Sequence, residues 1–213
     1  VVNYAGSAGA AADLVADIEK AGGRAMSFQA DVGDPEAVTR MFDAAEAAYG
    51  GVDVLVNNAG IMKLAPLAQV DDAAFDRTIA INLKGTFNGL REAANRLRDG
   101  GRIVNFSTSV VGLYQPGYGV YAATKAAVEA LTHILAKELG GRGVTVNAVA
   151  PGPVATELFF EGKDEATLDR IRQMNPLGRL GEVGDIANVV SLLVGPDAGW
   201  INSQIIRANG GVV

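Results

Sequence analysis

The chain has 213 residues, of which 49% are hydrophobic and 20% are charged, so it can bury one substantial core like an ordinary globular domain. Its net charge of −6, without any basic run, argues against a nucleic-acid partner and against an anionic membrane surface. Disulfides, thiolate metal sites and cysteine nucleophiles are excluded because there is no cysteine. No apolar run has the length of a bilayer span and no signal-peptide pattern is present, so we expect one cytoplasmic domain over residues 1–213.

Short apolar segments alternate with amphipathic ones along the chain. The predicted strands cover residues 1–4, 25–30, 52–56, 102–106, 144–149 and 204–207. The predicted helices cover 8–21, a segment opened by Asp34-Pro35, a long region from Asp71 or Asp72 to about Arg98, and then 119–139, 164–174 and 182–194. Strands that are apolar on both faces and separated by helices indicate a parallel sheet covered on both sides. With right-handed crossovers, the sequence predicts an α/β, Rossmann-like, doubly wound fold in a single domain.

Two side chains four residues apart, Tyr121 and Lys125, begin a long apolar helix after a Gly-rich loop. This spacing places them on one helical face. An adjacent ammonium favours the phenolate, so we expect Lys125 to lower the pKa of Tyr121 from its reference value near 10. The pair is therefore a candidate proton donor and acceptor.

Polar residues also follow two predicted strands. The hydroxyls of Ser107, Thr108 and Ser109 come directly after the strand that ends at Phe106. Asn57-Asn58-Ala59-Gly60 follows the strand 52–56, where it is either part of a ligand site or a plain turn. Ligands bind at the carboxyl ends of the strands in open α/β sheets, which makes both segments candidate site residues.

These motifs together resemble the short-chain dehydrogenase/reductase family, and the resemblance runs from Val1 to Val213. Their order and spacing are similar to the family pattern: Asn57-Asn58-Ala59-Gly60, Asn82, Ser109, Tyr121, Lys125 and Pro151-Gly152. The resemblance implies hydride transfer between a nicotinamide cofactor and a carbonyl or alcohol.

The resemblance also implies four catalytic roles. Tyr121 would be the general acid/base, while Lys125 would lower its pKa and hold the nicotinamide ribose. Ser109 would position the substrate oxygen, and is preferred over Ser107 because it directly precedes Val110-Val111-Gly112. Asn82 would hold a water in a proton relay behind Lys125, or else bond only to the helix backbone.

Further residues are implied to bind the cofactor. By resemblance, Asp31 and Val32 would contact the adenine ring. Asn58, Ala59 and Gly60 would line the ribose and pyrophosphate side of the cofactor. Pro151, Gly152, Val154 and Thr156 would lie on the nicotinamide side. The catalytic residues Tyr121 and Lys125 would contact the cofactor as well. No metal ligand set is expected, since the only histidine, His133, has neither a second histidine nor clustered carboxylates beside it.

The segment after the first predicted strand indicates the cofactor. An acidic side chain there would bond the adenosine 2′-hydroxyl and repel a 2′-phosphate. Here the segment offers the neutral side chains Asn3, Tyr4 and Ser7 instead. We therefore expect NADP(H) to be preferred over NAD(H).

The family's first strand and its Gly-rich pyrophosphate loop have no counterpart in the sequence. Gly6-Ser7-Ala8-Gly9 has two glycines where three are wanted, and the remaining motifs align only when Val1 lies in the second family strand. The absent β-α unit would supply the central strand of the sheet, so we expect the given sequence to be incomplete at its start.

The leading hypothesis is an NADP-dependent ketoreductase similar to 3-oxoacyl-thioester reductases, acting on a small carbonyl or alcohol. The alternatives are an NAD-linked alcohol or sugar dehydrogenase of the same fold, and an inactive, cofactor-poor scaffold. Residues 157–178 form either a lid over an apolar substrate or ordinary packing. Tyr114, Gln115 and Tyr118 are placed to touch substrate, and Trp200 with the C-terminal strand resembles the family segments that pack in a homotetramer or homodimer.

Overall fold

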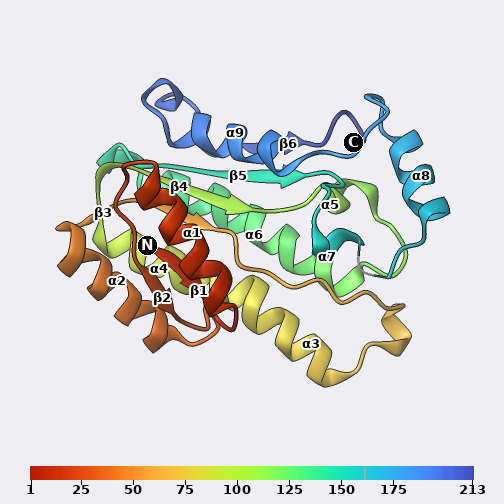
Figure 1. Cartoon of the computed structure of the whole chain (residues 1–213), viewed down its shortest axis with the longest axis horizontal. Coiled ribbons are helices and arrows are strands. Elements are labelled where there is room, and N and C mark those ends of the chain that lie inside the picture. Colours follow the sequence, from red (N-terminus) through yellow and green to blue (C-terminus); the bar gives the residue numbers. More distant parts are fainter. Residues whose placement is uncertain (161) are drawn as a thin grey trace.

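The computed structural model describes residues 1–160 and 162–213, which form a parallel α/β arrangement with helices on both faces of the sheet (Figure 1). The strands are β1 (Val2–Tyr4), β2 (Ser27–Gln29), β3 (Val52–Asn57), β4 (Leu97–Phe106), β5 (Thr145–Pro151) and β6 (Ile205–Ala208). The longer helices are α1 (Ala8–Lys20), α2 (Pro35–Tyr49), α3 (Asp72–Thr78), α4 (Thr86–Arg96), α6 (Gly119–Glu138), α8 (Glu165–Met174) and α9 (Val183–Val194). Two short helices, α5 (Val110–Leu113) and α7 (Glu157–Phe160), were not predicted from the sequence.

All the paired strands are parallel, as predicted, but they form two sheets. One sheet holds β1 and β2, and the other has the order β3-β4-β5-β6. In the described chain, β1 pairs only with β2, and β3 pairs only with β4. Val54 and Val56 on β3 are each 41% exposed although their type suits a core. The sheet is thus interrupted where the resemblance places the central family strand.

Helices cover the larger sheet from both sides. Helix α9 packs against β4 and β5 on one face, and α4 and α6 pack against the other face (Figure 1). The core on the α4 and α6 side includes Val38, Phe42 and Leu135, whereas the core under α9 includes Val149 and Leu193. Alternation of the helices between the two faces is what the doubly wound fold predicts.

Aspartates begin three of the predicted helices. The Asp34 carboxylate accepts a hydrogen bond from the Glu36 amide at 2.9 Å, Asp71 accepts from Ala74 at 2.6 Å, and Asp164 from Thr167 at 2.9 Å. Such caps satisfy amides that have no partner inside the helix. Of the two candidates for the long helical region, Asp71 is therefore the cap.

The long helical region is not uniform. It consists of α3, a π-helical segment η2 (Ile79–Gly85) and α4, which ends at Arg96. Strand β4 begins at Leu97, earlier than predicted, because Leu97 pairs with Val52 across a register irregularity. A single π-helical turn is frequent at functional sites, since it shifts the side chains that follow it around the helix axis.

A polar chain crosses the sheet beneath its carboxyl edge. Asn57 Nδ2 donates to Asn105 Oδ1 at 2.8 Å, and Asn105 Nδ2 donates to Thr132 Oγ1 at 2.9 Å. This chain joins β3, β4 and α6. Gly89 on α4 lies directly on it, because a Cβ at Gly89 would overlap Asn57 Oδ1.

We expect Gly89→Ala to lower the free energy of unfolding by about 1–3 kcal/mol, because the methyl group displaces Asn57 from its buried hydrogen bond. The matched control is Gly9→Ala on exposed α1, where the Cβ meets nothing within 4 Å. It should instead add about 0.5–1 kcal/mol, since alanine favours the helix. Urea unfolding of the three proteins measures both changes. Equal stability of both variants would contradict the close contact at Gly89.

Candidate active site

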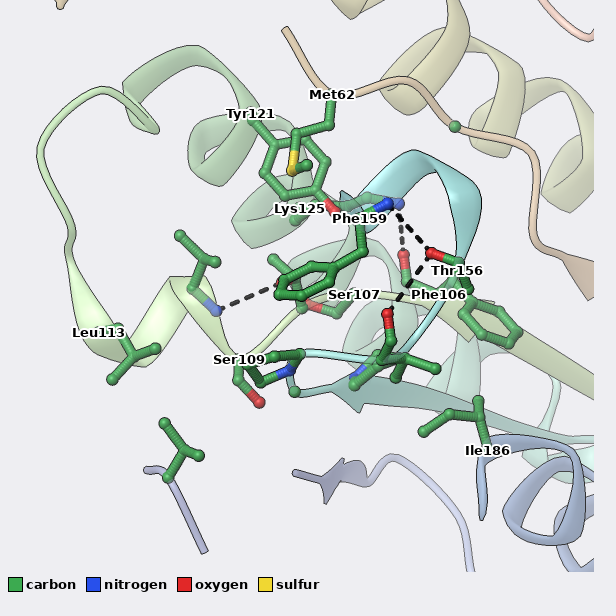
Figure 2. A pocket seen from close by; sticks show the side chains of 18 of the residues that line it. Met62, Phe106, Ser107, Ser109, Leu113, Tyr121, Lys125, Thr156, Phe159 and Ile186 are labelled. Carbon is green, nitrogen blue, oxygen red and sulfur yellow. Dashed lines mark hydrogen bonds between the residues drawn. The ribbon is translucent and has the colours of Figure 1, made fainter. Parts of the chain in front are cut away.

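Three strand ends and the helices beside them enclose one cavity of about 460 Å³ (Figure 2). Asn58 and Gly60 follow β3, Ser107 follows β4, and Pro151 ends β5. Because the strands are parallel, their carboxyl ends lie at the same edge, which is where the sequence placed the site. The expected catalytic residues Ser109, Tyr121 and Lys125 all line this cavity.

Lys125 is the buried cation of the site. Its side chain is on α6, the residue is 4% exposed, and its Nζ donates to the Phe106 carbonyl at 2.8 Å (Figure 2). Burial lowers the pKa of Lys125 to about 8, since the charged ammonium is poorly solvated. The carbonyl at the end of β4 therefore holds the ammonium where it faces the cavity.

Tyr121 lies one helical turn before Lys125, and Nζ is 5.9 Å from the centre of its ring. The sequence predicted a lowered pKa, but in this structure the pKa of Tyr121 is raised. Burial is the main cause; a hydrogen bond from Thr108 lowers it and the neighbouring Tyr118 raises it. The Lys125 ammonium, 5.9 Å from the ring centre, does not offset this effect of burial.

The three hydroxyls after β4 have different partners. Ser107 Oγ donates to Glu129 Oε1 at 2.6 Å, and Ser109 Oγ donates to the Ala150 carbonyl at 3.2 Å. Thr108 Oγ1 accepts from the Val110 amide at 3.3 Å. All three residues line the cavity together with Tyr121, so the expected role of Ser109 stays a prediction.

The three hydroxyls differ in the direction of their side chains at the strand end. Figure 2 shows the Ser109 hydroxyl pointing away from Tyr121. These directions depend on hydrogen-bond partners that the sequence does not display.

Asn82 is fully buried on the π-helical segment η2. Its Oδ1 accepts from the Ile61 amide at 2.8 Å, and its Nδ2 donates to the Ile61 carbonyl at 2.9 Å and to Thr124 Oγ1 at 3.3 Å. The side chain thus fastens the loop after β3 to α6. Its expected role in a water relay stays a prediction.

The donor set on the β3 and β5 side fits a nicotinamide nucleotide. Asn58, Gly60, Pro151, Gly152, Val154 and Thr156 all line the same cavity as Lys125, and Ala59 lies exposed between two of them. Gly60 lies directly beside the ammonium, since a Cβ there would contact Lys125 Nζ at 3.5 Å. Among the described residues, Phe106 is the one acceptor for that ammonium, so two of its N–H groups are free for ribose hydroxyls.

Asp31 and Val32 are placed beside η2 and α4 instead of lining the cavity. Asp31 accepts from Arg77 Nη1 at 2.9 Å and from the Gly33 amide at 2.9 Å, and these bonds lower its pKa. The Asn88 side chain donates to the Val32 carbonyl at 2.8 Å. Asp31 is therefore ionised and fixed as an acceptor, as an adenine amino group would need.

The three residues expected at the 2′-phosphate are not equivalent. Asn3 Nδ2 donates to the carbonyls of Phe28 and Ala30 on the neighbouring strand, at 3.2 and 3.1 Å. Both of its N–H groups are used, which corrects the expectation that Asn3 serves as a donor for phosphate. Tyr4 ends β1, and Ser7 precedes α1 without capping it, so these two side chains keep their hydroxyls available.

Much of the cavity lining is apolar, and it includes Met62, Leu113, Phe159, Ile171, Met174 and Val212. Lys125 is the one charged side chain in the lining of the described cavity. Of the expected lid, residues 157–178, Glu161 lies outside the described residues, and Leu168 packs in the interior. Leu168 therefore fits the packing interpretation, and the lid interpretation stays a prediction.

Only some of the other residues expected to contact the substrate line the cavity. Gln115 and Tyr118 line the cavity, whereas Tyr114 is 83% exposed and does not. His133 bonds the Ser203 hydroxyl at 3.0 Å. Within the described residues there is no cluster of three or more histidine, aspartate or glutamate side chains suited to a metal, and no helix with the length and apolar character of a membrane span.

Comparison with known proteins supports the resemblance to short-chain dehydrogenases/reductases. A family model described as enoyl-(acyl carrier protein) reductase matches residues 1–213. A short-chain type dehydrogenase/reductase from Picea abies is 44% identical over 223 residues, covering 100% of this chain and 82% of that protein. An NADPH-dependent aldehyde reductase-like chloroplastic protein from Arabidopsis thaliana is also 44% identical, over 227 residues that cover 100% of this chain and 84% of the relative.

Solved structures agree with these relatives. A short-chain dehydrogenase from Burkholderia cenocepacia J2315, in complex with NADP, has a TM-score of 0.93 at 36% identity, covering 99% of this chain and 85% of that one. Fold and site together define an oxidoreductase with a Rossmann-like sheet. The chain belongs to the short-chain dehydrogenase/reductase family, which confirms the resemblance drawn from its motifs.

Burial of Lys125 makes a prediction about stability. Its pKa is about 8 in the fold and 10.5 ordinarily, so between these pH values the unfolded chain binds a proton that the folded protein does not. The free energy of unfolding of the wild type should therefore rise with pH in this window. Lys125→Met should be more stable than the wild type by about 2 kcal/mol at pH 7, with the difference fading toward pH 10.5.

Urea unfolding at intervals from pH 7 to 10.5 tests this pH dependence. The control is Lys20→Met at the exposed end of α1, which should follow the wild type throughout. If the stability difference at Lys125 stays constant over the whole range, the charged ammonium is not buried as described.

Proposed function

We propose that the protein is an NADP(H)-dependent reductase of neutral, apolar aldehydes or ketones, running reversibly as an alcohol dehydrogenase. The observation that carries the proposal is that Ser109, Tyr121 and buried Lys125 line one cavity whose lining is otherwise largely apolar. Support comes from the Arabidopsis relative, named as an NADPH-dependent aldehyde reductase-like protein, and from the NADP complex of the Burkholderia relative.

Each polar residue has a distinct part in the proposed reaction. The nicotinamide, when bound, supplies or accepts the hydride. Ser109 turns its hydroxyl from the Ala150 carbonyl to the substrate oxygen and so holds that oxygen against Tyr121. Tyr121 gives its proton to that oxygen as general acid, and takes it back in the reverse direction. The Lys125 ammonium holds ribose hydroxyls and stabilises the phenolate that Tyr121 becomes.

The lining favours a neutral substrate with a bulky apolar group. A substrate carboxylate or phosphate would need a cation, and the lining of the described cavity offers only Lys125, whose remaining N–H groups would hold the ribose hydroxyls. A sugar would leave its hydroxyls without partners beside Met62, Leu113 and Val212, at a cost for each unmet hydrogen bond. The sugar dehydrogenase alternative is thus disfavoured. The acyl chain of a 3-oxoacyl thioester matches the apolar lining and belongs in the substrate panel.

The proposed preference for NADP(H) rests on the start of α1. The hydroxyls of Tyr4 and Ser7 flank this start, and the first turn of the helix carries no acidic residue. A helix N-terminus favours negative charge, and no carboxylate there opposes a 2′-phosphate. Asn3 takes no part, since its amide bonds β2.

We further propose that the protein assembles as a homotetramer or homodimer. Trp200 is 99% exposed, and Leu177, Leu192 and Ile134 are each more than half exposed. Exposed large apolar side chains of this kind are typical of subunit interfaces. Light scattering coupled to size-exclusion chromatography measures the oligomer directly.

Changing Tyr121 and Ser109 tests the catalytic assignment. Tyr121→Phe should lower kcat for an aromatic aldehyde by about 100-fold or more, because the general acid is lost. Ser109→Ala should lower kcat by about 10- to 100-fold through loss of the donor to the substrate oxygen, whereas Thr108→Val should stay near the wild type. Steady-state kinetics with NADPH measures all three. A larger loss of kcat in Thr108→Val than in Ser109→Ala would move the role to Thr108.

Titration with NADPH and NADH tests the cofactor preference. We expect NADPH to bind at least about tenfold more tightly than NADH, equivalent to about 1.4 kcal/mol. Ser7→Asp should reverse the preference, because the new carboxylate repels the 2′-phosphate and accepts from a 2′-hydroxyl. Ser7→Ala separates loss of the hydroxyl from addition of charge. Tighter binding of NADH to the wild type would refute the proposed preference.

A further inference from the structure

A short hydrogen bond beside the cavity, between Ser107 and Glu129, has no direct part in the proposed reaction. Ser107 directly follows β4 and is 4% exposed, and its Oγ donates to Glu129 Oε1 at 2.6 Å. A carboxylate only accepts hydrogen bonds, so the serine proton points to Glu129. Glu129 lies on α6, is partly buried, and does not line the cavity. The bond therefore joins the end of a strand to a helix from behind the reacting groups.

The spacing along α6 places Glu129 on the same helical face as the two catalytic residues of that helix. Tyr121, Lys125 and Glu129 follow one another at intervals of four residues. This face meets the end of β4, where Lys125 Nζ donates to the Phe106 carbonyl at 2.8 Å (Figure 2). Phe106 is followed by Ser107, so two successive residues of the strand end bond to two successive turns of the helix.

The main chain of the segment after β4 is held by β5. The Ser107 amide donates to the Val149 carbonyl at 2.8 Å, and the Ser109 amide donates to the Pro151 carbonyl at 2.9 Å. Ser109 is thus fixed to the sheet, whereas Tyr121 is fixed to α6. The distance between these two hydroxyls therefore depends on how α6 is attached to the end of β4.

We infer that Glu129 is a positioning residue that holds the end of β4 against α6 and so sets the distance between the Ser109 and Tyr121 hydroxyls. It acts through Ser107 and touches neither substrate nor cofactor. Lys125 makes the neighbouring bond to the strand end, but its ammonium also has the ribose hydroxyls to hold. The bond to Glu129 has no second task. The inference rests on the proposed function, because it takes Ser109 and Tyr121 as the groups that act on the substrate oxygen.

Replacing Glu129 tests this role through kcat and KM for benzaldehyde at saturating NADPH. Glu129→Ala frees the strand end, so kcat should fall about tenfold while KM changes by less than about threefold, because the reacting groups are misplaced and the apolar lining is intact. Glu129→Gln keeps an oxygen acceptor on a side chain of the same length, so its kcat should stay within about threefold of the wild type. Equal impairment of both variants would make the charge the important property and would refute the positioning role.

The other partner of the bond gives a second test. Ser107→Ala should lower kcat as much as Glu129→Ala does. The double variant should be little worse than either single one, since both substitutions remove the same hydrogen bond. Losses of kcat that multiply in the double variant would show that the two residues act separately, and would contradict the inference.

The matched control is Thr39→Ala, which removes another hydroxyl–carboxylate bond between two elements of the fold. Thr39 Oγ1 on α2 donates to Glu92 Oε1 on α4 at 3.1 Å, and neither residue lines the cavity. This variant should lower thermal stability and leave kcat within about twofold of the wild type. A fall of kcat as large as that of Glu129→Ala would mean that the loss of any such bond slows the reaction, which would overturn the specific role of Glu129.

Hydrogen exchange makes the test independent of turnover. In Glu129→Ala the backbone amides of Ser107 and Ser109 should exchange faster than in the wild type, and in Glu129→Gln they should not. A wild type that reduces no aldehyde with either cofactor would overturn the proposed function alone. Unchanged exchange of these two amides in Glu129→Ala would overturn the inference about Glu129, whatever the activity.

Discussion

The hydrogen bond from Lys125 Nζ to the Phe106 carbonyl is the contact on which the site depends. A buried ammonium has lost most of its hydration, and a strand-end carbonyl replaces part of it. Phe106 can offer that carbonyl because β4 ends there and no further strand pairing uses it. The same short segment then brings Ser109 to the cavity, where its hydroxyl donates to the Ala150 carbonyl. The end of β4 at Phe106 thus determines both where the site residues lie and how the charged ammonium of Lys125 is held.

The parallel sheet explains why residues so far apart in sequence converge. The carboxyl ends of β3, β4 and β5 lie at one edge, and the hydrogen bonds from Asn57 to Asn105 and on to Thr132 fix them to α6. Helix α6 in turn carries Tyr121 and Lys125. The π-helical segment η2 adds Asn82, which fastens the loop after β3 to the same helix through Thr124. The site is therefore held by buried polar side chains as well as by the sheet.

The elements and the site region were predictable because local chemistry determines them. Asp34, Asp71 and Asp164 begin helices by capping them, and the spacing of Tyr121 and Lys125 on one helix places them together whatever the rest does. The sequence could not show which of several chemically similar side chains bonds to which partner. Three adjacent hydroxyls differ only in their neighbours, and the amide of Asn3 is used by carbonyls 25 and 27 residues away. Such long-range pairings leave no local pattern.

The interruption between the two sheets has a consequence for handling the protein. On the side away from β4, the main chain of β3 has no strand partner in the described chain, and Val54 and Val56 add an apolar surface beside it. An open strand edge of this kind is a template for pairing with another polypeptide. A preparation of these 213 residues alone would therefore be prone to concentration-dependent β-aggregation, however well the catalytic corner is formed.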